Sequence, residues 1–234
     1  DVPAGQFVAI LGPNGSGKST LLKTIFGLTD VMGGTITCDG QPVLGRRTES
    51  LGDLGLAYVP QRENVFRTMT VHENLLLAVR GQAGHTAATA LGECYALFPT
   101  LQKRLAQKAG QLSGGERQML AISQALLCSP KLLLIDELSL GLAPHLVDQL
   151  MERLLTLRSD LGISILVIEQ DAAAALDIAD YAYIMEGGRI VYEGSPDKLR
   201  GHQDVQEFYL GTGASTRSSY RDVKQYRRSR RWWG

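Results

Sequence analysis

The sequence has few cysteines and few histidines, and their spacing excludes several classes of small or metal-stabilised protein. Only three of the 234 residues are cysteine, namely Cys38, Cys94 and Cys128. An odd number of widely spaced cysteines argues against a disulfide framework or a zinc ribbon. We therefore predict that they are small core residues in a protein of a reducing cytosol. The four histidines are equally scattered and show no metal-ligand spacing.

Long apolar runs are also absent. No segment approaches the ~20 apolar residues needed to cross a bilayer, so we expect any membrane association to be peripheral. The 44% of hydrophobic residues is nevertheless enough to bury the core of a full domain.

The chain as a whole has no net charge, because it contains 24 basic and 24 acidic residues. These residues are, however, unevenly distributed along the sequence. Residues 217–234 carry a net charge of +6, and the rest of the chain carries −6. We expect residues 212–234 to form a basic, disordered tail. Trp232 and Trp233 beside its arginines would suit an anionic membrane surface, and nucleic acid is the less favoured partner.

A glycine-rich turn is the most informative segment that is present. It joins a predicted strand, Phe7 to Leu11, to a predicted helix, Thr20 to Leu28, and it fits the pattern G-x-x-x-x-G-K-[ST]. That pattern wraps backbone N–H groups around nucleotide phosphates, so the expected ligand is ATP or GTP. The Lys18 ammonium can contact the β and γ phosphates, and the Ser19 hydroxyl can ligate Mg²⁺. The predicted nucleotide-binding residues are Gly12, Pro13, Asn14, Gly15, Ser16, Gly17, Lys18, Ser19 and Thr20.

A second predicted helix start, within residues 112–118, offers another site for phosphate. Ser113 and Glu116 have the spacing of a capping box, and Gly114 and Gly115 leave backbone amides accessible. Because a helix N-terminus attracts anions, one nucleotide could be bound from two places.

A short apolar run, Leu132 to Glu137, ends in two acids. It is typical of a central parallel strand whose carboxyl end opens on a ligand crevice. We assign Asp136 to Mg²⁺, bound directly or through water. Glu137 is assigned to the water that attacks the γ-phosphate, as the group that orients and deprotonates it.

The remaining sequence alternates predicted strands and helices, as α/β folds do. Thr70 and Glu73 form another capping box. Strands are expected at 35–40, 56–59 and 163–168 and in a hairpin at 181–192, and helices at 74–79, 87–97, after Pro144 and, as the last one, after Ser195. Residues 81–84 are expected to form a loop.

These motifs, in this order, resemble the ATP-binding subunits of ABC transporters over roughly residues 1–210. Residues 12–20 match Walker A, 112–118 the signature, 132–137 Walker B, 139–144 the D-loop and 167–170 the switch segment. Gln61 matches the Q-loop glutamine, which the resemblance assigns to the metal and water site. The chain looks most like the ATPases of branched-chain amino-acid importers. The ATPase of a urea or short-amide importer is the near alternative.

The resemblance implies an α/β fold of the P-loop NTPase class, an ABC-type nucleotide-binding domain over residues 1–211 with a helical signature subdomain at about 66–130. It implies a head-to-tail dimer, a homodimer or a heterodimer with a paralogue, in which Ser113, Gly114 and Gly115 of one subunit close over the γ-phosphate bound by Lys18 of the other.

The same resemblance implies ATP and Mg²⁺ as cofactors. It implies membrane permease subunits as partners, facing the loop from Arg62 to Thr70, and indirectly a substrate-binding protein. The expected location is cytoplasmic, on the inner face of the cell membrane.

Three departures from the family pattern bear on mechanism. The sequence starts just before the P-loop strand, without the strands and the adenine-stacking aromatic residue of the family, so we expect a truncated chain that binds ATP weakly. Gln170 replaces a histidine that contacts the γ-phosphate, but it still donates a hydrogen bond and is common in the importer subfamily, so we keep it as a catalytic residue. Leu138 replaces the usual proline, so the fine geometry of the D-loop cannot be carried over from the family.

Two other classes of function stay open. A soluble ABC ATPase that acts on DNA or ribosomes would usually contain coiled-coil insertions or a second tandem domain, and this sequence shows neither. A regulatory module that binds nucleotide without turnover would fail an assay of phosphate release. The presence of Glu137 favours an active ATPase, because losing a general base costs about 10²–10⁴ in rate.

Overall fold

The computed structural model describes residues 1–62, 64–79 and 87–210. The loop predicted at 81–84 and the tail predicted at 212–234 therefore lie outside the described residues.

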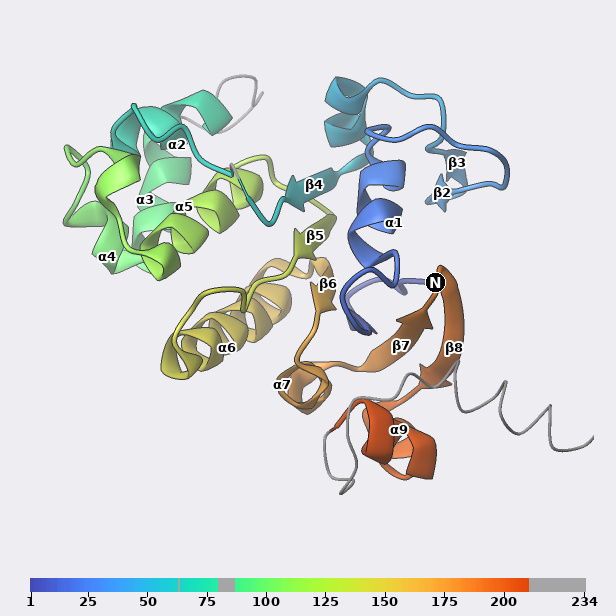
Figure 1. The fold of residues 1–234 in the computed structure, drawn as a ribbon. Coiled ribbons are helices and arrows are strands. Elements are labelled where there is room, and N and C mark those ends of the chain that lie inside the picture. The colour runs from blue at the N-terminus through green and yellow to red at the C-terminus, as the bar shows by residue number, and fades with distance from the viewer. Residues whose placement is uncertain (63, 80–86, 211–234) are drawn as a thin grey trace, which may run out of the picture.

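A six-stranded sheet forms the centre of the molecule (Figure 1). In spatial order its strands are β4 (Leu56–Val59), β5 (Leu132–Asp136), β6 (Ser164–Glu169), β1 (Phe7–Leu11), β7 (Tyr181–Glu186) and β8 (Arg189–Gly194). The first five are parallel, and β8 pairs with β7 in the antiparallel sense. Two short strands, β2 (Thr37–Cys38) and β3 (Gln41–Pro42), form a separate hairpin. The α/β class and the parallel central strands are confirmed.

The helices lie on both faces of the sheet and beyond its β4 edge (Figure 1). They are α1 (Lys18–Ile25), α2 (Val71–Val79), α3 (Ala87–Leu97), α4 (Pro99–Gln102), α5 (Gly114–Leu126), α6 (Pro144–Leu161), α7 (Ala172–Ile178), α8 (Pro196–Arg200) and α9 (Gln203–Phe208). Helices α2 to α5 gather beyond β4, whereas α1 and α6 cover opposite faces. The segments Thr48–Leu54 and Ala109–Gln111 are 3₁₀ helices.

Several predicted elements differ from those observed, each for a local reason. Helix α1 begins at Lys18 rather than Thr20, because Gly17 adopts the left-handed conformation that starts it, with φ of 103°. Strand β2 is shorter than predicted, because Asp39 and Gly40 have positive φ angles and form the turn of the hairpin. The helix after Ser195 was predicted to be the last one, but α9 follows it. The N-cap residue of α9 makes no side-chain hydrogen bond, so the sequence lacks the usual sign of a helix start there.

The cysteines do not all occupy the core. Cys94 is buried, Cys38 is partly buried, and Cys128 is exposed. The prediction that all three are core residues is therefore wrong for Cys128.

The alternation of side chains along each strand divides the core into two layers. Val8 and Ile10 point to one face, where they pack with Leu22 of α1. Phe7 and Leu11 point to the other face, in the cluster that includes residues of α5, α6 and α7. A parallel strand that is buried on both faces needs apolar residues at every position, which is why β1 reads as a continuous apolar run.

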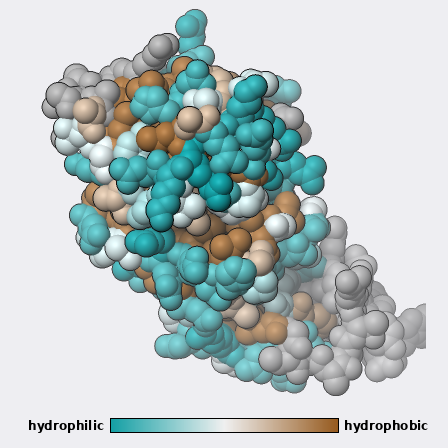
Figure 2. Space-filling model, turned by 90° about the vertical axis from the view of Figure 1, so that its left-hand side faces the viewer, coloured by the Kyte–Doolittle hydropathy of each residue, from teal (hydrophilic) through white to brown (hydrophobic). Residues whose placement is uncertain are grey.

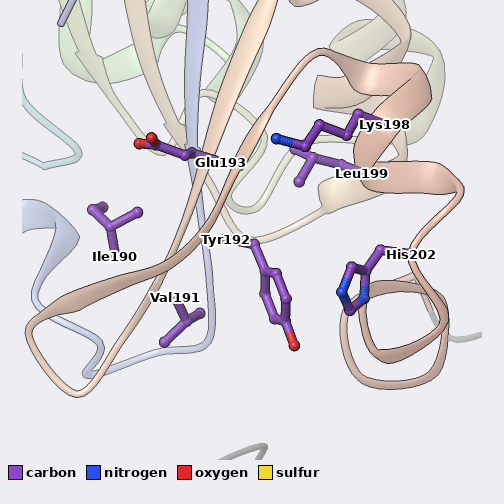
Figure 3. Close-up of a pocket in the computed structure, with 7 residues that line it drawn as sticks. All are labelled: Ile190, Val191, Tyr192, Glu193, Lys198, Leu199 and His202. Atoms are coloured by element: carbon purple, nitrogen blue, oxygen red, sulfur yellow. The ribbon is translucent and has the colours of Figure 1, made fainter.

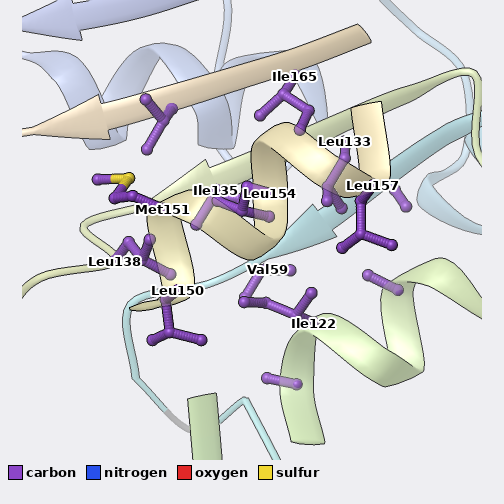
Figure 4. Packing of buried hydrophobic residues seen from close by; sticks show 14 of the residues in the cluster. Val59, Ile122, Leu133, Ile135, Leu138, Leu150, Met151, Leu154, Leu157 and Ile165 are labelled. Atoms are coloured by element: carbon purple, nitrogen blue, oxygen red, sulfur yellow. The ribbon is translucent and has the colours of Figure 1, made fainter. Parts of the chain in front are cut away.

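Leu138, the residue in place of the family's proline, belongs to this second layer. It is 1% exposed and lies near Leu150 and Met151 of α6 (Figure 4). Burying a leucine side chain contributes roughly 2 kcal/mol, so Leu138 stabilises the packing of the turn after β5 against α6.

The face seen in Figure 2 is predominantly hydrophilic, with hydrophobic residues in short bands between the polar ones. Among the described helices, none combines the length and the apolar character that crossing a bilayer requires.

A pocket of about 450 Å³ lies between β8 and the segment that contains α8 (Figure 3). It is lined by Ile190, Val191, Tyr192, Glu193, Lys198, Leu199 and His202, and none of these is a predicted site residue. The Tyr192 hydroxyl donates a hydrogen bond to Asp204 at 2.8 Å, which joins β8 to α9.

Candidate nucleotide-binding site

Apart from residues 113–115, the predicted site residues lie at or just after the carboxyl ends of four adjacent parallel strands. The P-loop follows β1, Gln61 lies after β4, and Gln170 follows β6. Asp136 is the last residue of β5, and Glu137 comes directly after it. Because β4, β5, β6 and β1 are neighbours and parallel, these ends meet at one edge of the sheet. The fold thus brings together segments that are far apart in the sequence.

The P-loop packs closely against the β7–β8 hairpin, and the glycines of the P-loop allow this close approach. A Cβ atom on Gly12 would lie 2.1 Å from the Met185 carbonyl oxygen, and one on Gly17 would lie 3.1 Å from the Met185 side chain. The Gly188 amide donates a hydrogen bond to the Ser16 carbonyl oxygen at 2.8 Å. There is therefore no room for a side chain at position 12, and only glycine fits there.

The loop has features that suit an anion. The first turn of α1 has no side-chain cap, so its amides remain available to a ligand. The buried Ser16 hydroxyl finds no hydrogen-bond partner among the described residues. Pro13, Asn14 and Gly15 are exposed at the tip of the loop, and Thr20 is exposed on α1.

The Lys18 side chain folds over the loop that precedes it. Its Nζ donates to the carbonyl oxygens of Gly12 at 2.7 Å and of Pro13 at 3.1 Å, and the side chain is 4% exposed. Burial lowers the pKa of the Lys18 ammonium, and the carboxylates of Glu137 and Asp136 oppose that shift. A bound phosphate would add negative charge close to this buried cation and stabilise its protonated form.

Ser19 and Asp136 meet as a candidate Mg²⁺ site. The Ser19 hydroxyl donates to Asp136 Oδ1 at 2.8 Å, and Asp136 is 2% exposed. A hydroxyl oxygen and a carboxylate are hard oxygen donors of the kind that Mg²⁺ prefers. The donor set therefore fits the predicted ion.

Gln61 and Glu137 are in direct contact. The Gln61 amide Nε2 donates a hydrogen bond to Glu137 Oε2. Glu137 has a positive φ of 51°, rare for a residue with a side chain, and its amide donates to the Ile168 carbonyl oxygen at 3.0 Å. The backbone at Glu137 thus leaves the strand direction and is tied to β6.

Glu169 at the end of β6 is tied to the turn that follows β5. Its carboxylate accepts from the Ser139 amide at 3.1 Å and from the Ser139 hydroxyl at 2.5 Å, and it is 1% exposed. Burial raises the pKa of Glu169 to about 7, although hydrogen bonds from Ser139 and the Leu138 amide oppose that shift. A proline at position 138 would lack this amide hydrogen. The adjacent Gln170 is exposed.

The N-terminus of α5 has the predicted capping box. Ser113 accepts from the Glu116 amide at 3.3 Å, and Glu116 accepts from the Ser113 amide at 2.8 Å. Cβ atoms on Gly114 and Gly115 would lie 3.2 and 3.1 Å from the side chains of Leu142 and Leu146. This helix start therefore packs closely against the start of α6, while Ser113 itself is exposed. Within the described chain, no hydrogen bond or ion pair joins residues 113–115 to the P-loop.

Comparisons with known proteins identify the family. A profile of the family described as ABC transporter matches residues 1–139. This chain belongs to the ABC transporter family. The probable branched-chain amino acid transport ATP-binding protein LivF of Archaeoglobus fulgidus is 38% identical over 211 residues, which are 90% of this chain and 89% of that protein. The high-affinity branched-chain amino acid transport ATP-binding protein BraG of Pseudomonas aeruginosa is 40% identical over 211 residues, 90% of each chain.

A solved structure of the same kind agrees with the fold. The ADP conformation of an ATP-binding cassette of an ABC transporter has a TM-score of 0.74 and 28% identity, covering 90% of this chain and 89% of that one. The protein is thus an ABC-type P-loop NTPase, a nucleotide-binding domain of a family that hydrolyses ATP.

Three side chains of this ABC ATPase have roles in the site that the sequence did not reveal. Tyr58 donates to Asp136, and Ser139 and Glu169 bind each other. The sequence could have drawn attention to Tyr58 only through its place on the strand that leads to Gln61. Its contact with Asp136 depends on the register between β4 and β5, which is known only from the fold. The link between Ser139 and Glu169 joins residues 30 positions apart.

Proposed function

We propose that this chain is the ATP-hydrolysing subunit of an importer of branched-chain amino acids. The observation that carries this conclusion is the meeting of the P-loop with two acids, Asp136 and Glu137, and their partners at one sheet edge. The relatives LivF and BraG, which match 90% of the chain, support the substrate class.

In this proposal residues 12–20 bind the triphosphate, with the Lys18 ammonium on the β and γ phosphates. Ser19, Gln61 and Asp136 hold Mg²⁺, which when bound would neutralise charge that develops on the phosphates. Glu137 accepts the proton of the attacking water, and Gln61 orients the Glu137 carboxylate. Gln170 contacts the γ-phosphate as a neutral donor. The contacts of Ser19 with Asp136 and of Gln61 with Glu137 support these roles.

The proposed active unit is a head-to-tail dimer, a homodimer or a heterodimer with a paralogue. In it Ser113, Gly114 and Gly115 contact the nucleotide bound by the partner subunit. The exposure of Ser113 and the absence of a link between residues 113–115 and the P-loop among the described residues support contact across a dimer. The signature helix would then belong to a helical subdomain at about 66–130 within an ABC domain of residues 1–211.

We also propose that membrane permease subunits bind the segment from Arg62 to Thr70. Phe66 in that segment is 58% exposed, and the buried Asn74 holds its backbone through hydrogen bonds to the Phe66 amide and carbonyl. A held backbone that presents an aromatic side chain suits a docking contact. The subunit would act on the cytoplasmic face of the cell membrane, with a substrate-binding protein as an indirect partner.

Phosphate release from ATP tests the enzymatic part. The wild-type protein should release phosphate only with Mg²⁺, and Glu137→Gln should bind ATP yet hydrolyse it about 10²–10⁴ times more slowly. Unchanged turnover in Glu137→Gln would reject the role of this residue. No turnover in the wild type, with ATP bound, would favour a regulatory module.

Uptake in cells tests the transported substrate. Loss of the encoding gene should lower uptake of labelled leucine, and a Lys18→Ala copy should fail to restore it. Normal leucine uptake with lowered uptake of urea or a short amide would favour the alternative importer. No change in uptake of any of these would favour a non-transport ABC ATPase.

A further inference from the structure

Tyr58 and Asp136 lie on neighbouring strands and on the same face of the sheet. The register of β4 and β5 pairs Tyr58 with Leu134. Because side chains alternate with a period of two, Asp136 shares the face of Leu134, one step closer to the carboxyl edge. Helix α1, which contains Ser19 in its first turn, packs on this face. Three polar side chains from three elements therefore meet above an apolar layer.

Each oxygen of the Asp136 carboxylate has its own donor. Oδ1 accepts from the Ser19 hydroxyl at 2.8 Å, and Oδ2 accepts from the Tyr58 hydroxyl at 3.2 Å. With a donor on each side, the buried carboxylate is restricted to one orientation. Oδ1 is then held beside Ser19, the other candidate metal ligand.

The Tyr58 ring is itself held in place. It stacks on Phe26, the C-cap residue of α1, with ring centroids 5.0 Å apart and planes inclined by 26°. A tyrosine hydroxyl ordinarily carries its proton at physiological pH, so it can act as the hydrogen-bond donor to Asp136. Helix α1 thus supplies Ser19 at its start and the support for Tyr58 at its end.

We propose that Tyr58 is a positioning residue that sets the metal affinity of the site by orienting Asp136. Strand β4 and the segment after it then contact both acids, since Tyr58 donates to Asp136 and Gln61 donates to Glu137. This inference rests on the proposed role of Asp136 in holding Mg²⁺. Hydrogen-bond partners of metal ligands typically change metal affinity 10–100-fold when they are removed.

The test measures how much Mg²⁺ increases the affinity for nucleotide. Calorimetry compares the binding of a non-hydrolysable ATP analogue in Mg²⁺ with its binding in EDTA, and the ratio of the two affinities is the Mg²⁺-dependent gain. Tyr58→Phe keeps the stacked ring and removes only the hydroxyl. It should reduce the Mg²⁺-dependent gain about tenfold and leave the affinity in EDTA unchanged. The matched control is Tyr192→Phe, which removes a hydroxyl bound to the Asp204 carboxylate away from the site and should leave both affinities unchanged.

Two results would overturn the inference: an unchanged Mg²⁺-dependent gain in Tyr58→Phe, or an equal loss of affinity with and without metal, which would indicate a purely structural role. Asp136→Asn separates this inference from the proposed function. If Asp136→Asn abolishes the gain and Tyr58→Phe does not change it, only the role of Tyr58 fails. If Asp136→Asn also retains the gain, the proposed metal site itself is wrong.

Discussion

Glu169 is the residue whose surroundings differ most from those of an ordinary surface acid. Its carboxyl pKa rises to about 7 from the usual 4.5, chiefly because it is buried at the end of β6. Between these two values the folded protein retains a proton that the unfolded chain has lost. The contribution of Glu169 to the free energy of unfolding should therefore decrease by up to about 3 kcal/mol as pH rises from 4.5 to 7 and then level off.

Glu169→Gln removes this ionisation while leaving a polar group of similar size beside Ser139. Relative to the wild type, the variant should gain up to about 3 kcal/mol of stability between pH 5 and pH 8. Urea unfolding at several pH values measures the difference. Parallel stability profiles for the two proteins would show that Glu169 titrates normally in the folded state.

Residue-level contacts of this kind were the least predictable part of the site. The P-loop, the acid pair and the capping box of α5 are local patterns, so the sequence alone pointed to Lys18, Asp136 and Ser113 as candidates. The contacts of Tyr58 with Asp136 and of Glu169 with Ser139 depend on which strands are neighbours and in what register. No periodicity within one segment encodes that information.

At the scale of elements, the connection from β4 to α2 depends on one buried amide. Asn74 is fully buried, and its side chain bonds to the Phe66 amide and to the carbonyl oxygens of Phe66 and Thr70. Gln124 of α5 also donates to the Asn74 carbonyl oxygen at 3.1 Å. The loop after Gln61 is thereby joined to both α2 and α5.

Asn74→Ala should lower the free energy of unfolding by about 2–3 kcal/mol, because it leaves buried backbone groups unpaired. Limited trypsin digestion should cut the variant faster at Arg67 than the wild type. Gln107→Ala is the control, because the Gln107 side chain also bonds to backbone but is only partly buried, and it should have a small effect. Equal stability and equal cleavage of Asn74→Ala and the wild type would contradict this role.

Elements themselves were predicted well where a strong local signal marks them. The five apolar residues of β1 and the helix after Pro144 agree with the sequence. The errors fall where backbone conformation rather than hydrophobicity sets a boundary, as at Gly17 before α1 and at Asp39 and Gly40 after β2. Helix α9 was missed because its start lacks a capping side chain.

At the scale of the whole molecule, the proposed dimer can be tested without disturbing the fold. Aspartate caps a helix as well as serine does, so Ser113→Asp should preserve α5 while placing a negative charge against the phosphates of the partner subunit. In a Glu137→Gln background, light scattering should show dimers with Mg²⁺ and ATP, and Ser113→Asp should abolish them.

Ser195→Asp is the matched control, because Ser195 caps α8 in the same way. It should dimerise like the parent protein. Dimers that persist in the Ser113→Asp protein would contradict contact between the signature helix and the partner's nucleotide.

The hydrogen bond between the Gly188 amide and the Ser16 carbonyl oxygen joins the start of the chain to its last hairpin. Because this bond ties the phosphate-binding turn to the turn between β7 and β8, neither turn can move away from the other without breaking it. Residues 16 and 188 are far apart in the sequence, yet the fold holds them together beside the candidate nucleotide-binding site.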